Sequence, residues 1–251
     1  MRVLLIRHGQ SANNVLAESQ GHDYAAYMAG RVPEPPLSEI GHCQAQRLAD
    51  HLAAAAARPR PETDRLAWVT SEHPVDALYV SPMLRALQTA LPISRALGVQ
   101  PQVWVDIHEH GGVFTGTPEK GNVVGYPGLT RAEMEAQFGG YRVAAGVHDG
   151  GWWPGGYEQM DVCYGRACRV AGELYALAEG QPDATIALVT HGTFLDALLQ
   201  ALFVPGEAYG DRVHFSHLNT AISRIDFGSG RRLALRYLNR IDHLPAELVT
   251  R

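Results

Sequence analysis

Short apolar runs, each bounded by polar residues or glycine, recur along the chain. Four of them have the length and apolar content of buried β-strands. These are residues 3–6, 76–81, 102–106 and 185–189. Two later runs, 219–227 and 232–237, are joined through a Gly-Ser-Gly turn at 228–230, which indicates a pair of strands. The pattern therefore predicts six strands.

Segments with helical spacing of apolar residues lie between these strands. One begins at Ser38, a favourable N-cap, and is expected to end at Pro59. Another follows the second strand, where Ser81 before Pro82 indicates a helix start. Further helices are expected at 130–138, 158–177 and 194–203, and residues 14–20 are compatible with helix or coil. Prolines and glycine predict an irregular segment over 22–36.

Chemically active side chains stand where the predicted strands end. Arg7 and His8 follow the first strand, and Gly9 then allows the chain to turn both toward one ligand. Arg85 lies one turn into the helix after the second strand, and His191 follows the fourth. Open α/β sheets bind ligands at the carboxyl ends of their strands. Taken alone, the Arg-His-Gly triplet fits an exposed Arg-His pair at a strand end equally well. The presence of arginine or histidine at further strand ends favours a binding site.

Glu109 follows the third strand and is flanked by His108 and His110. Three such side chains in a row also suggest a metal site. Strand alternation would send both histidines away from the carboxylate, so a shared metal is the weaker interpretation. His214 and His217 have metal-like spacing without a carboxylate nearby in sequence, and we treat them as ordinary surface or core residues.

The bulk composition is that of an ordinary globular protein. With 251 residues, 46% of them hydrophobic and 19% charged, the chain can bury one large core. Its net charge of −5 offers no basic field for nucleic acid, and no apolar run approaches the length of a membrane span. Three cysteines and no secretory leader predict a cytoplasmic protein without a disulfide framework. The oligomeric state stays open, with a homodimer among the alternatives.

Four motifs occur in a fixed order along the chain. They are Arg7-His8-Gly9, Pro36-Leu37-Ser38 with Gly41 and Gln44-Ala45, Ser81-Pro82 with Arg85-Ala86 and Gln88-Thr89-Ala90, and His191-Gly192. Together they resemble the histidine phosphatase superfamily, in its phosphoglycerate-mutase-like branch (branch 1). Glycine after the second histidine fits this branch better than the acid-phosphatase branch, where aspartate usually follows. The resemblance implies a three-layer α/β/α sandwich with a mostly parallel central sheet, built as a single domain over 1–251.

The resemblance also implies a role for each site residue. His8 is expected to attack phosphorus and become a phosphohistidine, while Arg7 and Arg85 bind the phosphate oxygens. His191, protonated beside the anion, is expected to stabilise the transition state, and Glu109 to protonate the leaving group. Substrate-side contacts are expected from Ser11, Asn14, Gln20, Gly21, Gly192 and Glu158. Neither a metal nor a cofactor is required, because the two arginines supply the positive charge.

The implied activity is hydrolysis of a small phosphorylated metabolite. The family's mutases carry a characteristic segment, with basic residues for the second substrate carboxylate, between the acid and the second histidine. Residues 112–156 are instead rich in glycine and aromatic residues, which favours water as the final acceptor. Two alternatives remain: a phosphoglycerate mutase-type phosphotransferase, and a non-catalytic module that binds phosphate.

The glycine-rich stretch 112–156 is expected to form a cap over the site. A loop-rich segment of this length is usually functional or disordered, and its tryptophan pair, Trp152 and Trp153, argues against disorder. A cap with these aromatic residues predicts a preference for monoesters with an apolar or aromatic body over small multiply charged sugars. The alternative is an insertion without a role at the site, anchored to the core by the same tryptophans.

Overall fold

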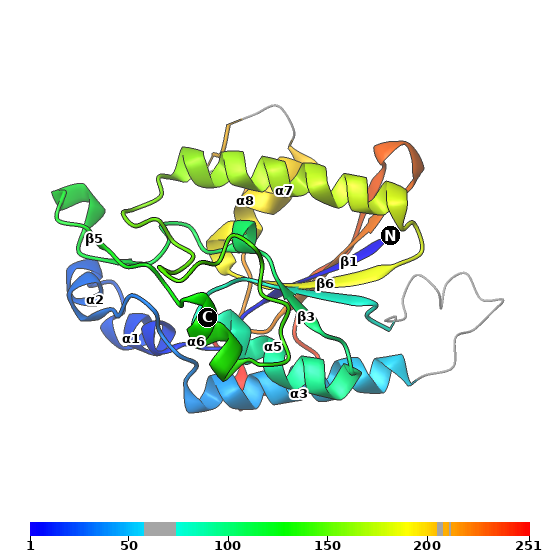
Figure 1. The fold of residues 1–251 in the computed structure, drawn as a ribbon, viewed down its shortest axis with the longest axis horizontal. Coiled ribbons are helices and arrows are strands. Elements are labelled where there is room, and N and C mark those ends of the chain that lie inside the picture. Colours follow the sequence, from blue (N-terminus) through cyan, green and yellow to red (C-terminus); the bar gives the residue numbers. More distant parts are fainter. Residues whose placement is uncertain (58–73, 205–207, 211) are drawn as a thin grey trace.

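One six-stranded sheet forms the centre of the molecule (Figure 1). The structure, a computed structural model, describes residues 1–57, 74–204, 208–210 and 212–251. The sheet has the strand order β3-β2-β6-β1-β7-β8. Its strands are β1 (Arg2–Arg7), β2 (Ala77–Val80), β3 (Pro101–Val103), β6 (Thr185–Thr190), β7 (Ile222–Phe227) and β8 (Leu233–Arg240). Each of the six overlaps a run that the sequence predicts as a strand.

Four neighbouring strands, β3, β2, β6 and β1, run parallel to one another. Strand β7 is antiparallel to β1, and β8 is antiparallel to β7. The carboxyl ends of the four parallel strands therefore meet at one edge of the sheet. In sheets of this kind, that edge is where ligands bind.

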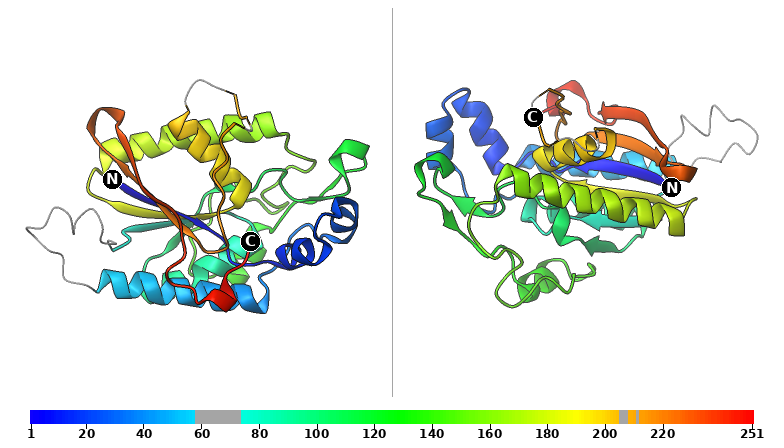
Figure 2. Two further views of the ribbon diagram at one scale, coloured as in Figure 1. Left: turned by 180° about the vertical axis from the view of Figure 1, so that it is seen from behind. Right: turned by 90° about the horizontal axis from the view of Figure 1, so that it is seen from above.

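Helices cover both faces of the sheet and complete three layers (Figure 2). Helices α3 (Glu39–Ala56) and α5 (Leu84–Leu97) pack on one face, and α7 (Met160–Gly180) and α8 (Gly192–Phe203) pack on the other. The prediction of an α/β/α sandwich with a mostly parallel sheet is thus confirmed. Helix α3 ends at Ala56, and Pro59, where its end was expected, lies outside the described residues.

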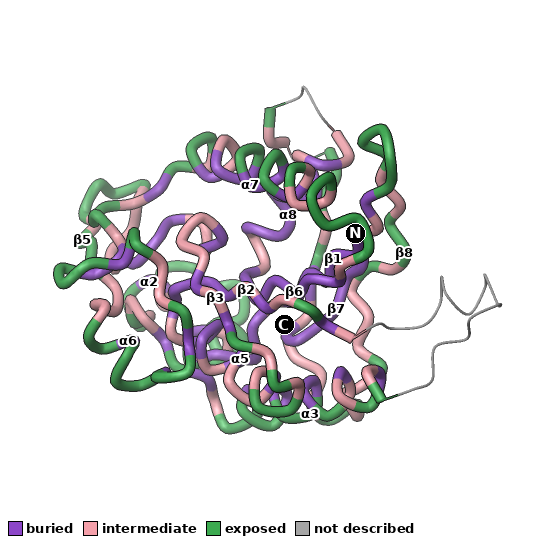
Figure 3. The backbone as a smooth tube through the Cα atoms, turned by 45° about the vertical axis from the view of Figure 1, so that its right-hand side comes forward, coloured by how far each residue is buried: buried purple, intermediate pink, exposed green. Residues whose placement is uncertain are grey.

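Strand β1 shows why the layers form. Its side chains alternate between the two faces of the sheet. Leu4 and Ile6 belong to the hydrophobic core beneath α3 and α5, whereas Val3 and Leu5 belong to the core beneath α7 and α8. A strand buried on both faces reads as a continuous apolar run rather than as an alternating pattern. Figure 3 shows the burial concentrated along the sheet and on the inner sides of the helices.

Two helices occupy the segment between β1 and α3. Helix α1 (Ala12–Gln20) begins at the N-cap Ser11, and α2 (Tyr24–Gly30) begins at Asp23, whose side chain accepts from the amide of Ala26. The sequence predicts an irregular chain over 22–36, so α2 corrects that expectation. The breakers that dominate this segment lie at or after the C-terminal end of α2, where they end the helix instead of preventing it.

The start of α5 also differs from the expectation. Ser81 does not cap this helix, which begins at Leu84 with Met83 as its N-cap. The backbone amide of Leu84 donates instead to a carboxylate oxygen of Glu34, at 2.9 Å. The Ser81 hydroxyl accepts from the amide of Met83, at 3.3 Å, and also lies 2.7 Å from Nε2 of His191.

The stretch 112–156 contains little regular structure. Its elements are β4 (Phe114–Thr115), β5 (Val124–Gly125), the short 3₁₀ helix η2 (Pro118–Lys120) and α6 (Arg131–Gln137). Trp152 is buried in the core on the α3 and α5 side, and Trp153 packs against that core. The tryptophans thus anchor the stretch, as the alternative interpretation expects.

The remaining described elements are three 3₁₀ helices: η1 (Val105–Ile107), η3 (Ser229–Arg231) and η4 (Ala246–Leu248). All three cysteines are free thiols. Among the described residues, no helix combines the length and the apolar character that crossing a bilayer requires.

Candidate active site

The residues with predicted catalytic roles converge at the carboxyl edge of the sheet, around a cavity of about 380 Å³. His8 follows β1, Arg85 lies in the first turn of α5, and Glu109 follows η1. These three line the cavity together with Arg7. His191, at the end of β6, is fully buried and does not line it, but its ring centroid lies 5.1 Å from that of His8.

His8 is held in one neutral form by its two neighbours. Its Nδ1 lies 2.6 Å from the carbonyl oxygen of Gly9, which can only accept, so Nδ1 carries the proton. The Arg85 Nε–H donates to Nε2 of the same ring, at 3.1 Å. A guanidinium has no acceptor, so Nε2 presents its lone pair. The geometry thus fixes the nitrogen that is able to act as a nucleophile.

Burial and neighbouring charge keep this histidine neutral. Burial lowers the pKa of His8 well below its ordinary value, and the positive charges of Arg85 and Arg7 lower it further. Burial also lowers the pKa of Arg7 to about 10, so Arg7 stays charged at neutral pH. Burial lowers the pKa of Arg85 as well, although the negative charges of Glu34 and Glu109 raise it in part.

The site around His191 disfavours a protonated ring in the free protein, whereas the expectation of a protonated ring refers to the state with a bound anion. The pKa of His191 lies well below the ordinary value because of burial, then because of the charge of Arg85. Its Nε2 is 2.7 Å from the Ser81 hydroxyl, whereas Nδ1 is buried without a partner among the described residues. An unpartnered buried nitrogen beside His8 is a ready position for an oxygen of a bound anion.

Two glycines allow the turn after β1 to pack against α3. A Cβ on Gly9 would lie 2.7 Å from the carbonyl oxygen of Gly41, and a Cβ on Gly41 would lie 2.0 Å from that of Gln10. Neither position can accept a side chain without a backbone shift. Thr89 links the same turn to α5, because its hydroxyl accepts from Gly9 N at 3.0 Å and donates to Arg85 O at 2.7 Å.

The Glu109 carboxylate lies against the N-terminal end of α8. One oxygen accepts from the amides of His110 and Phe194, each at 2.9 Å, and the other lies 3.3 Å from the amide of Thr193. The Glu109 carboxyl group therefore lies at the positive end of the helix dipole. The second oxygen has only the longer contact, with the Thr193 amide, and is therefore the oxygen more available to a ligand.

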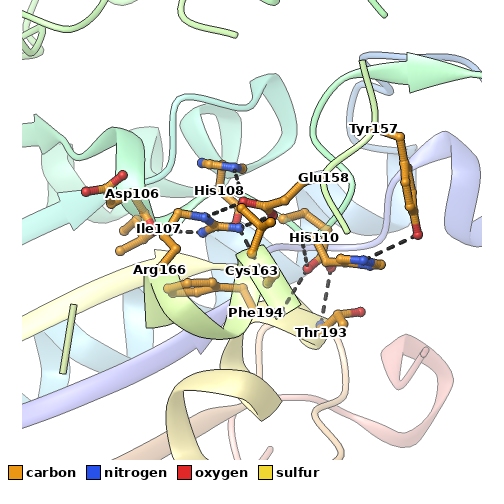
Figure 4. Close-up of polar contacts among 12 residues, drawn as sticks. Asp106, Ile107, His108, His110, Tyr157, Glu158, Cys163, Arg166, Thr193 and Phe194 are labelled. Atoms are coloured by element: carbon orange, nitrogen blue, oxygen red, sulfur yellow. Dashed lines mark hydrogen bonds and ion pairs between the residues drawn. The ribbon is translucent and has the colours of Figure 1, made fainter. Parts of the chain in front are cut away.

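A buried ion pair supports the loop that carries Glu109 (Figure 4). Arg166 donates to both oxygens of Glu158, at 2.9 and 2.6 Å. It also donates to the carbonyl oxygens of Asp106 and His108, at 2.7 and 2.9 Å, directly before Glu109. Burial raises the pKa of Glu158, but hydrogen bonds from His108 and Arg166 together lower it to about 2.

The expected substrate contacts are placed unevenly. Ser11 and Asn14 line the cavity and form a capping box at the start of α1, which leaves the Asn14 amide nitrogen unbonded to any described residue. Gln20 and Gly21 are exposed at the far end of α1 and do not line the cavity. Glu158 is used in the ion pair with Arg166 and does not line it either.

Gly192 does not line the cavity, but its lack of a side chain leaves room for a residue that does. A Cβ at this position would lie 3.4 Å from Nε of Arg7, so the glycine leaves room for that guanidinium. Arg7 in turn donates from Nη1 to the carbonyl oxygen of His217, at 2.5 Å, while its Nε is buried without a partner among the described residues. The charge of Arg7 is thus positioned, and no side chain in the described part of the protein neutralises it through an ion pair.

Comparison with known proteins decides the family. A model described as the histidine phosphatase superfamily (branch 1) matches residues 3–240. The chain belongs to this superfamily. With phosphatases among its relatives, this histidine phosphatase is a phosphoric monoester hydrolase.

Two relatives from Mycobacterium tuberculosis are similar in sequence. Glucosyl-3-phosphoglycerate phosphatase is 28% identical over 207 residues, covering 80% of this chain and 74% of that protein. The PE-PGRS family protein PE_PGRS11 is 30% identical over 115 residues, which are 45% of this chain. This match spans only 15% of PE_PGRS11.

Solved structures share the fold of this histidine phosphatase. The ecdysone phosphate phosphatase from Bombix mori has a TM-score of 0.61 at 16% identity, covering 96% of this chain and 95% of that one. Phosphoserine phosphatase from Entamoeba histolytica, in complex with 3-phosphoglyceric acid, has a TM-score of 0.54 at 20% identity, covering 97% and 99%. Identities this low carry information on the fold alone.

The sequence did not point to the outer wall of the cavity in this histidine phosphatase. Helix α2 and the residue after it contribute Tyr24, Tyr27 and Arg31 to the lining, to which His110 and Tyr157 also belong. The hydroxyl of Tyr157 lies 3.3 Å from Nε2 of His110. A helical spacing of the two tyrosines was the available signal, hidden within a segment read as irregular.

The weaker metal interpretations gain no support from the placement of the histidines. His108 points its Nδ1 to the carbonyl oxygen of Val105, at 2.7 Å, and not toward Glu109. His214 pairs with the buried Asp196 at 2.7 Å. Within the described ranges, no three histidine, cysteine or acidic side chains are grouped as a metal site requires.

Proposed function

We propose that this histidine phosphatase hydrolyses small phosphomonoesters without a metal ion, through a phosphohistidine at His8. The observation that supports it most is the state of His8, a neutral ring whose Nε2 lone pair faces Arg85. A nucleophile of this kind needs a cationic setting for the phosphate and a proton donor for the leaving group. Arg7, Arg85 and Glu109 lie in the same cavity.

In the first step, phosphate oxygens take over the guanidinium donors of Arg85 and Arg7, which frees the lone pair of His8. Nε2 of His8 then forms a bond to phosphorus while the ester P–O bond breaks. Glu109 gives its proton to the departing oxygen. The loose transition state carries its charge on the equatorial oxygens, which the arginine forks stabilise.

In the second step, water attacks the phosphorus of the phosphohistidine. Glu109 accepts a proton from that water, the N–P bond breaks, and inorganic phosphate leaves. The unpartnered Nδ1 of His191 then contacts an oxygen of the transferring phosphoryl group. The bound anion offsets the field of Arg85, so the pKa of His191 rises toward its ordinary value when substrate is present.

The supporting test is turnover of p-nitrophenyl phosphate in the presence of EDTA, by wild type and His8→Ala. We expect full activity for wild type in the chelator, none for His8→Ala, and acid-labile phosphate on His8 in quenched reactions. A label recovered on His191 would exchange the two roles. Activity that is lost in EDTA and restored by a divalent ion would overturn the metal-free mechanism, and stoichiometric binding without turnover would favour a phosphate-binding module.

The acceptor separates hydrolysis from a mutase-type transfer. We expect the phosphoryl group to appear as inorganic phosphate even when alcohols are supplied at high concentration. Arg7 and Arg85 are both occupied by the phosphate, so neither is left to bind an acceptor alcohol. Transfer to a phosphoglycerate acceptor in preference to water would instead identify a phosphotransferase.

The cap over 112–156 remains part of the proposal, in a reduced form. Gly112, Phe114 and Pro118 are the residues of this stretch that line the cavity. Tyr24 and Tyr27 of α2 also line it. We expect these aromatic and apolar surfaces to contact the body of the substrate, so esters with an apolar or aromatic body are preferred.

A further inference from the structure

The hydroxyl of Ser81 contacts the ring of His191. Both residues are fully buried. Ser81 directly follows β2 and His191 directly follows β6, and these two strands are neighbours in the sheet. The hydroxyl oxygen lies 2.7 Å from Nε2 of the ring. Neither the attack by His8 nor the proton transfer by Glu109 uses this contact, so it has no part in the steps assigned to those residues.

The Ser81 hydroxyl has one proton to donate and lone pairs with which to accept. One lone pair accepts from the amide of Met83, at 3.3 Å. In the described part of the chain, Nε2 of His191 is the other hydrogen-bond partner of this hydroxyl. Because a buried hydroxyl proton without an acceptor is unfavourable, the proton is directed at Nε2.

This hydrogen bond decides which nitrogen of the neutral His191 ring carries the proton. A neutral imidazole is a donor at one nitrogen and an acceptor at the other. Since Nε2 accepts from Ser81, Nδ1 carries the proton. The opposite tautomer would direct Nε2–H at the hydroxyl oxygen, and the hydroxyl proton would then have no acceptor among the described residues. The Ser81 contact therefore favours the Nδ1–H tautomer.

The resulting Nδ1–H group is available to the substrate. Nδ1 is buried without a partner among the described residues, and the centroid of the ring lies 5.1 Å from that of His8. A phosphate oxygen is a hydrogen-bond acceptor, so an N–H attracts it and a nitrogen lone pair repels it. A protonated ring also carries a proton on Nδ1. With Ser81 in place, the donor is thus present in both the neutral and the protonated form.

A donor that does not depend on protonation suits the surroundings of this ring. Burial lowers the pKa of His191 most strongly, and charged or titratable groups from four separate elements lower it further. They are Arg85 of α5, His8 after β1, His108 after η1 and Arg166 of α7. A ring that first needed a proton would be a poor phosphate donor at neutral pH in this environment.

We propose that Ser81 is a positioning residue that fixes the Nδ1–H tautomer of His191, so that a neutral ring donates a hydrogen bond to the transferring phosphoryl group. This inference rests on the proposed phosphatase function, and it adds how His191 acts without gaining a proton. No proton has to move to or from His191 in either reaction step.

The pH dependence of turnover tests this role. Ser81→Ala removes the donor to Nε2, so the neutral ring can take either tautomer, whereas the protonated ring still carries Nδ1–H. With p-nitrophenyl phosphate, we expect Ser81→Ala to lower kcat/KM about 10- to 100-fold at pH 8, up to the scale of one preorganised transition-state donor. The ratio of wild type to variant should shrink toward pH 5.5, as the ring gains a proton.

Two further variants separate this role from the loss of a buried hydrogen bond. Ser81→Thr keeps the hydroxyl and should recover most of the activity across the pH range. Ser223→Ala removes another fully buried hydroxyl, which accepts from the amide of Asn239 at 2.9 Å and lies 2.9 Å from Nε2 of His217. Any loss in Ser223→Ala should be the same at pH 5.5 and pH 8. A loss in Ser81→Ala that is equally independent of pH, or activity equal to wild type, would overturn the proposal.

Nitrogen NMR of the His191 ring keeps the test independent of turnover. The signal is assigned by its absence in His191→Gln. At pH 8, wild type should show the Nδ1–H tautomer both free and with inorganic phosphate, and Ser81→Ala should show a mixture of the two tautomers. An Nε2–H tautomer in wild type would overturn the proposal. The Nδ1–H tautomer in a wild type that binds phosphate but hydrolyses no ester would support the assignment of Ser81 and instead overturn the proposed hydrolase function.

Discussion

Nε of Arg85 lies 3.1 Å from Nε2 of His8, with its N–H directed at the lone pair of the imidazole. In the free protein, this guanidinium therefore occupies the lone pair of the nitrogen that we propose as the nucleophile, and in the same proposal it binds the phosphate when substrate enters. Since Arg85 is in the first turn of α5 and His8 follows β1, the pair joins two separate parts of the fold. Both residues are almost fully buried, so this arrangement is not disturbed by solvent.

Loss of this arginine should slow the reaction without unfolding the protein. Arg85→Ala is expected to lower kcat/KM about 100- to 1,000-fold, the scale for one preorganised transition-state donor. Steady-state kinetics with p-nitrophenyl phosphate measure it. Arg95→Ala, in the last turn of the same helix, is the matched control. A value for Arg85→Ala within a few-fold of wild type would remove Arg85 from the site.

His8 should stay neutral across the physiological range. Its pKa is held well below the ordinary value by burial and by the charges of Arg85 and Arg7, so the neutral ring persists on the acid side of pH 6.5, the ordinary value. Nitrogen NMR shifts of His8 should therefore remain those of the Nδ1–H tautomer between about pH 5.5 and 8. A titration of the His8 ring with a midpoint near 6.5 would contradict this assignment.

The role of Glu109 should appear in the dependence on the leaving group. Glu109→Gln is expected to slow alkyl phosphates about 100-fold or more, because their leaving oxygen needs a proton. Hydrolysis of p-nitrophenyl phosphate should be affected much less, since nitrophenolate leaves without one. Rates on the two substrates give the comparison. Equal losses on both would assign the acid to another carboxylate, with Glu34 the first candidate.

Glu34 should make the stability of the protein depend on pH. Burial raises its pKa from 4.5 to about 7, although the charge of Arg85 and the hydrogen bond from the Leu84 amide both lower it in part. Between these two values the folded state holds a proton that the unfolded state releases. This contribution to the free energy of unfolding is fully present below pH 4.5 and is lost as the pH rises through 7.

Urea unfolding at pH 5 and pH 8 tests this linkage. Wild type should lose more stability between the two pH values than Glu34→Gln, whose side chain cannot ionise. Glutamine also keeps an oxygen that can accept from the amide of Leu84, as one Glu34 oxygen does at 2.9 Å. Parallel pH dependences for the two proteins would show that Glu34 ionises with an ordinary pKa in the folded state.

The ion pair behind Glu109 should be important for folding. Glu158→Gln leaves Arg166 buried without its counter-charge, which is expected to cost roughly 3–5 kcal/mol in the free energy of unfolding. Chemical denaturation measures it. Asp226→Asn is the comparison, because Asp226 is more exposed than Glu158 and its loss is expected to cost less. A Glu158→Gln protein as stable as wild type would show that the pair is not required.

Much of this architecture could be predicted from the sequence because its signals are local. Buried parallel strands give continuous apolar runs, and the four parallel strands of the sheet overlap such runs. The antiparallel strands β7 and β8 could be predicted as a pair from the Gly-Ser-Gly turn between them. His8, Arg85 and His191 follow strands whose carboxyl ends share one edge, so their convergence follows from the topology.

What could not be predicted depends on contacts between distant segments. Ser81 resembles a helix cap by its neighbours, but a histidine 110 positions later takes its hydroxyl and Glu34 caps α5 instead. The lowered pKa of His191 in the free protein comes from burial and then from the charge of Arg85, neither of which is visible in its local sequence. Trp152 gives the same local signal whether it faces a cavity or a core, and the packing of the chain decided for the core.

The position of β1 in the sheet also affects how the protein is made. Arg7 pairs with Thr190 on one side, and Ile6 pairs with Ile222 on the other, so both neighbours of the first strand are encoded near the end of the chain. A ribosome synthesises the N-terminal part first, and pairings this distant in sequence form slowly. The nascent polypeptide therefore carries His8 through most of its synthesis without a phosphate pocket, and enzymatic competence arises only after β6 and β7 have emerged from the exit tunnel.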